Sequence, residues 1–128
     1  MSDKAESLQF SIVIPVYNEA ENIEPMVREI QAAFAGRPET YEVICVDDAS
    51  TDDSPAVLQR LTSETAGVVM SLRHRNNFGQ SAAVGTGFRA ARGEWIGTLD
   101  GDGQNDPADL PHMLDAARRL GVDCVTGV

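Results

Sequence analysis

The chain has little cysteine and no long hydrophobic run. Its 128 residues include two cysteines, Cys45 and Cys124, and each lies inside a short apolar stretch typical of a core position. This spacing gives neither a disulfide framework nor a zinc site. No apolar stretch approaches the roughly 18 residues of a membrane-spanning helix, and residues 1–9 lack the apolar segment of a signal peptide. These absences predict a soluble, cytoplasmic domain.

Basic side chains are also scarce. The chain has 10 Lys and Arg residues against 20 Asp and Glu residues, so its formal net charge is −10. A surface this acidic repels phosphate backbones and anionic lipids, which argues against nucleic acid as a partner and against membrane contact through this segment. A phosphate-bearing ligand would need a divalent cation between itself and the protein. The hydrophobic content of 42% is nevertheless that of an ordinary folded domain.

Short apolar runs alternate with segments of helical periodicity along the whole chain. Strands are predicted at residues 10–16, 41–46, 67–72, 94–99 and 122–128. Strands that alternate with helices of 10–15 residues indicate βαβ crossovers, hence an α/β fold in three layers with a mostly parallel sheet. Because the last predicted strand runs to Val128 with no polar tail, we expect a chain truncated after its fifth strand.

Local capping signals predict where the helices begin. Asn18 precedes an apolar helical pattern, and Glu21 stands where the second half of a capping box belongs. Ser54 before Pro55 is typical of an N-cap followed by the first helical residue. Asp109 is the predicted cap of the last helix.

Polar residues follow the first four predicted strands. They form the segments 15–19, 47–53, 73–79 and 100–106, three of which are rich in acidic or amide side chains. In open α/β sheets, ligands bind beyond the carboxyl ends of the strands. We therefore expect the functional site at this edge of the sheet.

Asp100 and Asp102 are the strongest chemical signal. Two carboxylates this close in a glycine-rich turn repel each other unless a proton or a cation lies between them. Oxygen ligands of this kind suit Mg²⁺ or Mn²⁺, and Gln104 offers one more oxygen. The alternative is a solvated acidic turn that caps the next helix through Asp106 or Asp109.

The other strand ends carry weaker signals. Asp47 and Asp48 place at least one carboxylate in the predicted crevice, where it can accept hydrogen bonds from a base or a ribose, although both could instead belong to an Asx turn. Tyr17 could stack on a base or pack under its loop. His74 lies between two arginines, and a lone histidine is more typical of a structural role than of a catalytic one.

Several competing motifs are absent from the sequence. Counting from Asp100, an EF-hand would need glycine at position 105 and glutamate at position 111, which are Asn105 and Pro111. No P-loop, GxGxxG or GxSxG pattern occurs. The first strand leads into Tyr-Asn-Glu and not into the aspartates of phosphotransfer receivers and phosphatases.

The segments 11–19 (SIVIPVYNE), 46–52 (VDDASTD) and 98–107 (TLDGDGQNDP) resemble the signature segments of family 2 glycosyltransferases. The segment 77–88 (NFGQSAAVGTGF) further resembles the polyprenyl-phosphate branch, typified by dolichol-phosphate mannose synthases. The resemblance covers nearly the whole chain, and the four motifs occur in the family's order. It implies a GT-A fold, a UDP- or GDP-linked sugar donor, inverting transfer and a lipid-phosphate acceptor.

The resemblance also assigns roles by motif position. Asp100 and Asp102 would be the catalytic, metal-binding DxD pair for Mg²⁺ or Mn²⁺, with Gln104 as a further metal ligand. Gly101 stands where many relatives have alanine. The residues implied to contact the nucleotide are Pro15, Tyr17, Glu19, Val46, Asp48, Asp100 and Gly101.

Members of this family continue beyond the fifth strand into acceptor-binding and membrane-associated elements. Residues 1–128 are therefore expected to be the nucleotide-sugar-binding part of a GT-A domain at the cytoplasmic face of a membrane, without turnover in isolation. A non-catalytic nucleotide-sugar-binding module, or a truncated pseudoenzyme, is the alternative. A sugar nucleotidyltransferase is a third hypothesis, but its glycine-rich loop after the first strand is missing.

Overall fold

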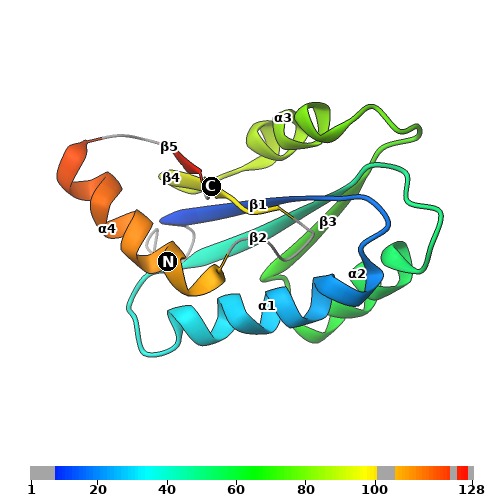
Figure 1. Cartoon of the computed structure of the whole chain (residues 1–128). Helices are drawn as coiled ribbons and strands as arrows, with labels where there is room; N and C mark the ends of the chain where they lie inside the picture. Colours follow the sequence, from blue (N-terminus) through cyan, green and yellow to red (C-terminus); the bar gives the residue numbers. More distant parts are fainter. Residues whose placement is uncertain (1–7, 101–105, 122–123, 127–128) are drawn as a thin grey trace, which may run out of the picture.

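A computed structural model describes residues 8–100, 106–121 and 124–126, and it confirms an α/β architecture. The five strands form one parallel sheet in the order β3-β2-β1-β4-β5 (Figure 1). The strands are β1 (Phe10–Val16), β2 (Tyr41–Asp47), β3 (Val69–Arg73), β4 (Trp95–Thr98) and β5 (Cys124–Thr126). The helices are α1 (Ala20–Phe34), α2 (Ser54–Glu64), α3 (Gln80–Ala90) and α4 (Leu110–Leu120), with a 3₁₀ turn, η2 (Pro107–Asp109), before α4.

Strand β1 is the centre of the sheet and is buried along its whole length. It pairs with β2 on one side, where Phe10 lies opposite Tyr41, and with β4 on the other, where Phe10 lies opposite Trp95. A strand buried on both faces needs apolar residues at successive positions, which explains the nearly continuous apolar run in its sequence. Strands β2 and β4 pair directly with β1, while β3 joins the sheet through β2 and β5 joins it through β4.

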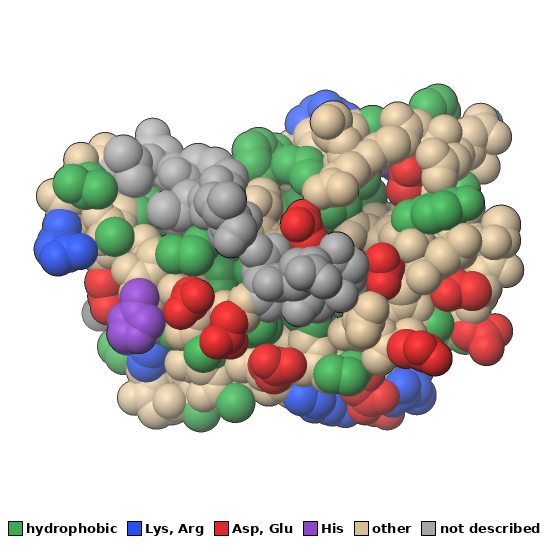
Figure 2. Space-filling model, in the orientation of Figure 1, with side chains coloured by type: hydrophobic (Ala, Val, Ile, Leu, Met, Phe, Trp, Pro, Cys, Tyr) green, Lys and Arg blue, Asp and Glu red, His purple; other side chains and the backbone are tan. Residues whose placement is uncertain are grey.

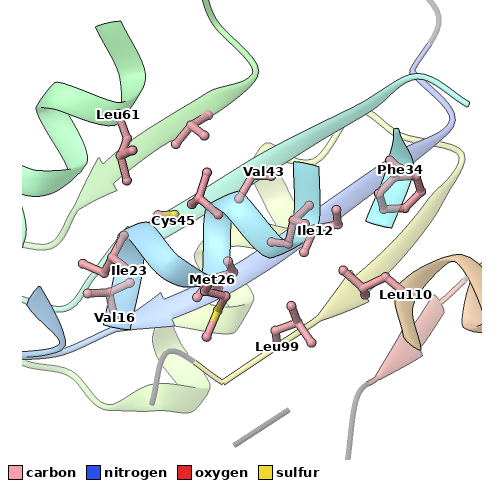
Figure 3. Packing of buried hydrophobic residues seen from close by; sticks show 14 of the residues in the cluster. Ile12, Val16, Ile23, Met26, Phe34, Val43, Cys45, Leu61, Leu99 and Leu110 are labelled. Atoms are coloured by element: carbon pink, nitrogen blue, oxygen red, sulfur yellow. The ribbon is translucent and has the colours of Figure 1, made fainter. Parts of the chain in front are cut away.

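Helices cover both faces of the sheet, which gives the predicted three layers. On one face, α1 and α2 pack with Leu110 and Leu114 of α4 over side chains of β1 and β2, as the close view of Ile12, Val43 and Met26 shows (Figure 3). On the other face, α3 covers Val13 and Ile44 through Ala83. None of the described helices combines the length and the apolar character that crossing a membrane requires.

Cys45 confirms its predicted place in the core. It is fully buried among the side chains under α1 and α2. Burial raises the pKa of the Cys45 thiol to about 12, because a thiolate would be poorly solvated there. Cys45 is therefore a packing residue and not a reactive thiol.

The starts of the helices follow the local capping signals only in part. Asn18 does not cap α1: its backbone is left-handed (φ 53°), and its side-chain oxygen accepts hydrogen bonds from the Thr51 and Asp52 N–H groups. Ser54 is the first residue of α2 and not its N-cap. Asp109 is the N-cap residue of α4, as predicted, but its side chain makes no capping hydrogen bond. Asp106 caps the preceding 3₁₀ turn and accepts a hydrogen bond from the Ala108 N–H at 3.0 Å.

Gly87 allows α3 to lie close against β1. A Cβ atom at this position would lie 2.3 Å from Cγ1 of Val13, well inside van der Waals contact. We expect Gly87→Ala to lower the free energy of unfolding by about 1–3 kcal/mol, because helix and strand must separate. Gly85→Ala is the matched control, since its added methyl group would meet only the flexible Arg89 side chain at 3.6 Å. Gly85→Ala should raise the free energy of unfolding by about 0.5–1 kcal/mol, because alanine has a higher helix propensity than glycine. Urea denaturation of the two variants measures both effects, and equal stabilities would contradict the close packing.

Candidate functional site

A hollow of about 150 Å³ opens at the carboxyl ends of β1 and β2, beside the first turn of α3. It brings together residues from four separate segments of the chain. Its lining consists of Pro15, Val16, Tyr17, Glu19, Asp48, Gln80, Ala83 and Asp100. The sequence-predicted residues Pro15, Tyr17, Glu19, Asp48 and Asp100 therefore share one site.

The topology explains why the hollow forms here. The chain passes from β1 to β2 and β3 on one side of the sheet, and then crosses to β4 on the other side of β1. Helices α1 and α3 consequently leave on opposite faces, and a crevice opens where the strand order reverses. The loops that follow β1, β2 and β3 gather at this edge, on the right in Figure 1.

The loop after β1 is held in place by the loop after β2. The Asn18 N–H donates to Ser50 Oγ at 2.9 Å, and the Glu19 N–H donates to Ser54 Oγ at 3.1 Å. The Ala20 N–H donates to Asp52 Oδ2 at 3.3 Å. These hydrogen bonds satisfy amide groups at the start of α1, and they fix the position of the loop that contains Tyr17 and Glu19. Tyr17 keeps 44% of its surface exposed beside the hollow.

Asp48 is buried and holds the loop that enters α3. Its Oδ1 accepts hydrogen bonds from the Phe78 N–H at 2.9 Å and from His74 Nδ1 at 2.8 Å, and its Oδ2 accepts one from the Gly79 N–H at 2.7 Å. Burial alone would raise the pKa of Asp48, but these hydrogen bonds outweigh it and lower the pKa below its usual value. Asp48 therefore lies at the hollow as a carboxylate that fixes the surrounding backbone.

His74 has a structural position, as its isolation in the sequence suggested. Its second ring nitrogen, Nε2, lies 2.8 Å from Thr86 Oγ1 on α3, so the ring bridges the end of β2 and the middle of that helix. The Phe78 ring packs against it edge to face at 5.6 Å. No motif predicts this bridge, because it depends on the approach of α3 to β2.

Gln80 is a hollow residue that the sequence reasoning missed. Its side-chain Nε2 donates a hydrogen bond to Asp100 Oδ1 at 2.9 Å. The two residues are 20 positions apart. Gln80 is the first residue of α3 and Asp100 follows β4, so no local pattern in the sequence joins them.

The remaining predicted residues are placed differently. Val46 has no exposed surface and packs with Val13, Ile44 and Ala83 on the α3 face, so its side chain is not part of the hollow lining. Gly101, Asp102 and Gln104 lie outside the described residues.

Of the residues predicted to bind a metal ion, Asp100 is the one that lies within the described residues. It supplies a hard carboxylate oxygen at the hollow, as Mg²⁺ and Mn²⁺ require. Within residues 8–100, 106–121 and 124–126, no group of three or more His, Cys, Asp or Glu residues could hold a metal ion. The donor set at the hollow fits a cation that takes few protein ligands and completes its shell with phosphate and water.

A second, larger groove of about 540 Å³ lies between α2 and the edge strand β3. Its walls include Pro55, Gln59, Met70 and Arg73. Arg73 lines this groove and not the hollow, and its guanidinium donates to the Ser50 carbonyl oxygen at 3.2 Å. We take the smaller hollow as the candidate functional site, because most of the residues predicted to bind the nucleotide line it.

The charge distribution matches the composition. Acidic side chains are spread over the face shown in Figure 2, and most basic side chains on this face lie toward its edges. Among the described residues that line the hollow, Glu19, Asp48 and Asp100 are acidic and none is basic. An anionic ligand at this site therefore needs a cation with it.

Comparisons with known proteins agree with this geometry. The model of the glycosyl transferase family 2 matches residues 11–128. The chain is 36% identical over 126 residues to a dodecaprenyl-phosphate galacturonate synthase of Rhizobium johnstonii, covering 98% of this chain and 37% of that protein. It is 41% identical over 118 residues to an undecaprenyl-phosphate 4-deoxy-4-formamido-L-arabinose transferase of Pseudomonas fluorescens, covering 92% of this chain and 34% of that protein.

Solved structures give the same result for the fold. A mannosyltransferase from Pyrobaculum calidifontis, solved with GDP-Man and Mn²⁺, matches with a TM-score of 0.69 and 28% identity, over 80% of this chain and 30% of that one. TarS of S. aureus, solved with UDP-GlcNAc, matches with a TM-score of 0.67 and 21% identity, over 89% of this chain and 31% of that one. The chain thus spans about a third of the length of these relatives. By its family match and its fold, this chain belongs to glycosyl transferase family 2.

Proposed function

We propose that the hollow binds the nucleotide of a UDP- or GDP-linked sugar, and that residues 1–128 are the donor-binding part of a glycosyltransferase. The main observation behind this proposal is that one hollow is lined by Tyr17, Glu19, Asp48 and Asp100, which come from three different loops. The hollow lies where the strand order of the sheet reverses. The ligands named for two similar solved structures, GDP-Man with Mn²⁺ and UDP-GlcNAc, support this class of donor.

Each residue at the hollow has a suitable chemistry for this ligand. The half-exposed ring of Tyr17 offers a face on which a base can stack. Glu19 and Asp48 offer carboxylate oxygens to base or ribose donors. Asp100, together with Asp102 and Gln104, would hold Mg²⁺ or Mn²⁺. When bound, the metal would neutralise the diphosphate and the charge that develops as it leaves.

The acceptor in this proposal is a polyprenyl phosphate. The names of the similar proteins from Rhizobium johnstonii and Pseudomonas fluorescens both include a polyprenyl phosphate. A phosphate is already ionised near neutral pH, so it can attack the anomeric carbon of the sugar without a strong general base. Attack from the face opposite the nucleotide would invert the configuration. The residues that bind the acceptor would come from the part of such proteins that this chain does not match. The transfer would take place at the cytoplasmic face of a membrane.

Calorimetric titration with UDP and with GDP, each with and without Mn²⁺, tests the proposal. We expect one nucleotide to bind more tightly with Mn²⁺, by about tenfold or more, because the cation shields the carboxylates at the hollow from the diphosphate. Asp102→Ala should remove that gain. Asp109→Ala is the matched control, since Asp109 makes no capping bond and does not line the hollow. A folded chain that binds neither nucleotide would overturn the proposal, and equal affinity with and without Mn²⁺ would overturn its metal dependence.

A further inference from the structure

We propose that Gln80 is a positioning residue, which holds the Asp100 carboxylate in the orientation that faces a metal-bound nucleotide. This inference rests on the proposed function and assigns one more residue to the same site. Its starting point is the exposed 2.9 Å hydrogen bond from Gln80 Nε2 to Asp100 Oδ1, which joins two residues that line the hollow.

The Gln80 end is fixed by the loop that precedes α3. Gly79 lies at the start of the helix with a left-handed backbone (φ 102°), which favours glycine. The Phe78 and Gly79 N–H groups both donate to the buried Asp48 carboxylate. One turn later, Ala83 is fully buried against the sheet, and its N–H donates to the Gly79 carbonyl oxygen at 3.1 Å. The first turn of α3 is therefore anchored on both sides of Gln80.

The Asp100 end is fixed by β1. The Leu99 N–H donates to the Val13 carbonyl oxygen at 3.0 Å, just beyond the last paired residue of β4. The Leu99 side chain is 2% exposed and packs in the core under α1. Helix α3 also approaches β1 closely at Val13, where Gly87 faces it. Asp100 and Gln80 thus extend from backbones that are anchored to the same strand.

The side-chain amide of Gln80 is a suitable hydrogen-bond donor to a carboxylate that binds a metal ion. A lysine or arginine at this position would neutralise the Asp100 carboxylate and repel a cation. A glutamine amide orients the carboxylate through one hydrogen bond and leaves its negative charge in place. Groups that orient metal ligands in this way typically change metal affinity by about 10–100-fold when they are removed. The geometry therefore assigns Gln80 to the support of the cation site and not to contact with the sugar.

The variant Gln80→Met tests this role, because it keeps the length of the side chain and removes its hydrogen-bond donor. Calorimetry with UDP and GDP, with and without Mn²⁺, should show that the gain in affinity due to Mn²⁺ falls about tenfold. The affinity without Mn²⁺ should stay at the wild-type value. Collapse of the hollow would lower both affinities, so this difference separates positioning from a general structural role. Gln59→Met, the same change at an exposed position on α2, is the matched control.

A second measurement tests the contact without any nucleotide. In a ¹⁵N–¹H NMR spectrum, the side-chain amide signals of Gln80 should move in Asp100→Asn and stay in place in Asp53→Asn. Unmoved signals in Asp100→Asn, or a wild-type Mn²⁺ gain in Gln80→Met, would overturn the inference while the proposed function stands. A wild-type chain that binds neither nucleotide would instead overturn the proposed function and the role of Gln80 with it, although the contact would still be seen by NMR.

Discussion

Asp48→Ala is expected to lower the free energy of unfolding by about 3–5 kcal/mol. The buried carboxylate accepts hydrogen bonds from two backbone N–H groups and from the His74 ring. Hydrogen bonds to a charged group contribute about 1.5–3 kcal/mol each, and the unpaired N–H groups add a desolvation cost, while relaxation of the loop recovers part of the loss. Urea denaturation at neutral pH measures the effect.

Asp53→Ala is the control for this prediction. Asp53 is exposed, follows Asp48 in the same loop, and makes no side-chain capping bond at the start of α2. Its removal should change the free energy of unfolding by less than about 0.5 kcal/mol. Similar losses in the two variants would mean that the loop is not held through Asp48.

The contribution of Asp48 also depends on pH. The hydrogen bonds from the Phe78 N–H, the His74 ring and the Gly79 N–H outweigh the effect of burial and keep the pKa of Asp48 below its usual value. A lowered pKa in the folded state stabilises the protein fully above the unfolded-state pKa of about 3.9, and the stabilisation is lost as the pH falls through the folded-state pKa. The difference in stability between the wild-type chain and Asp48→Ala should therefore narrow below about pH 4.

Arg92→Ala is expected to lower the free energy of unfolding by about 2–4 kcal/mol, although 65% of the Arg92 side chain is exposed. Its guanidinium donates to Oε1 of Glu42, whose side chain is only 2% exposed, at 2.9 and 3.2 Å. The other carboxylate oxygen of Glu42 accepts hydrogen bonds from Ser11 Oγ and from the Arg92 N–H, so Glu42 cannot turn toward water. Loss of the guanidinium leaves a buried charge without its ionic partner, which is costly.

Arg28→Ala is the matched control for Arg92. Arg28 is also half-exposed and forms ion pairs with Glu24 and Glu64, but both of these partners are exposed as well. Exposed pairs of this kind contribute about 0–1 kcal/mol, because water solvates each charge when the other is removed. Urea denaturation of both variants should give a clear difference. Equal losses would show that burial of Glu42 does not matter for the pair.

Much of the fold follows from the local sequence. The apolar run at residues 10–16 predicts β1 with its observed bounds, because a central parallel strand must be apolar on both faces. The third strand shows the limit of this reasoning: it was expected at residues 67–72 and lies at Val69–Arg73. Gly67 has φ +91°, and the Val68 N–H closes a turn onto the Thr65 carbonyl oxygen, so the backbone becomes extended only after this turn.

The predicted N-cap at Asn18 is wrong for a tertiary reason. Asn18 has the side chain of a good N-cap, yet it binds the loop after β2, where N–H groups of Thr51 and Asp52 face it. The first amide groups of α1 are satisfied by Ser54 and Asp52, more than 30 residues away. Nearest-neighbour rules do not include these partners, because the two loops meet only after β1 and β2 have paired.

The sequence by itself determined the α/β order of elements, the sheet edge at which the hollow lies and most of the residues that line it. Periodicity and residue type act locally, and parallel strands necessarily bring their carboxyl ends to the same edge. Only the tertiary structure decided that Val46 faces the core, that Asp48 holds the loop before α3 and that Gln80 meets Asp100. Those contacts join residues 20 or more positions apart, and they depend on the crossover that carries α3 to the opposite face of the sheet.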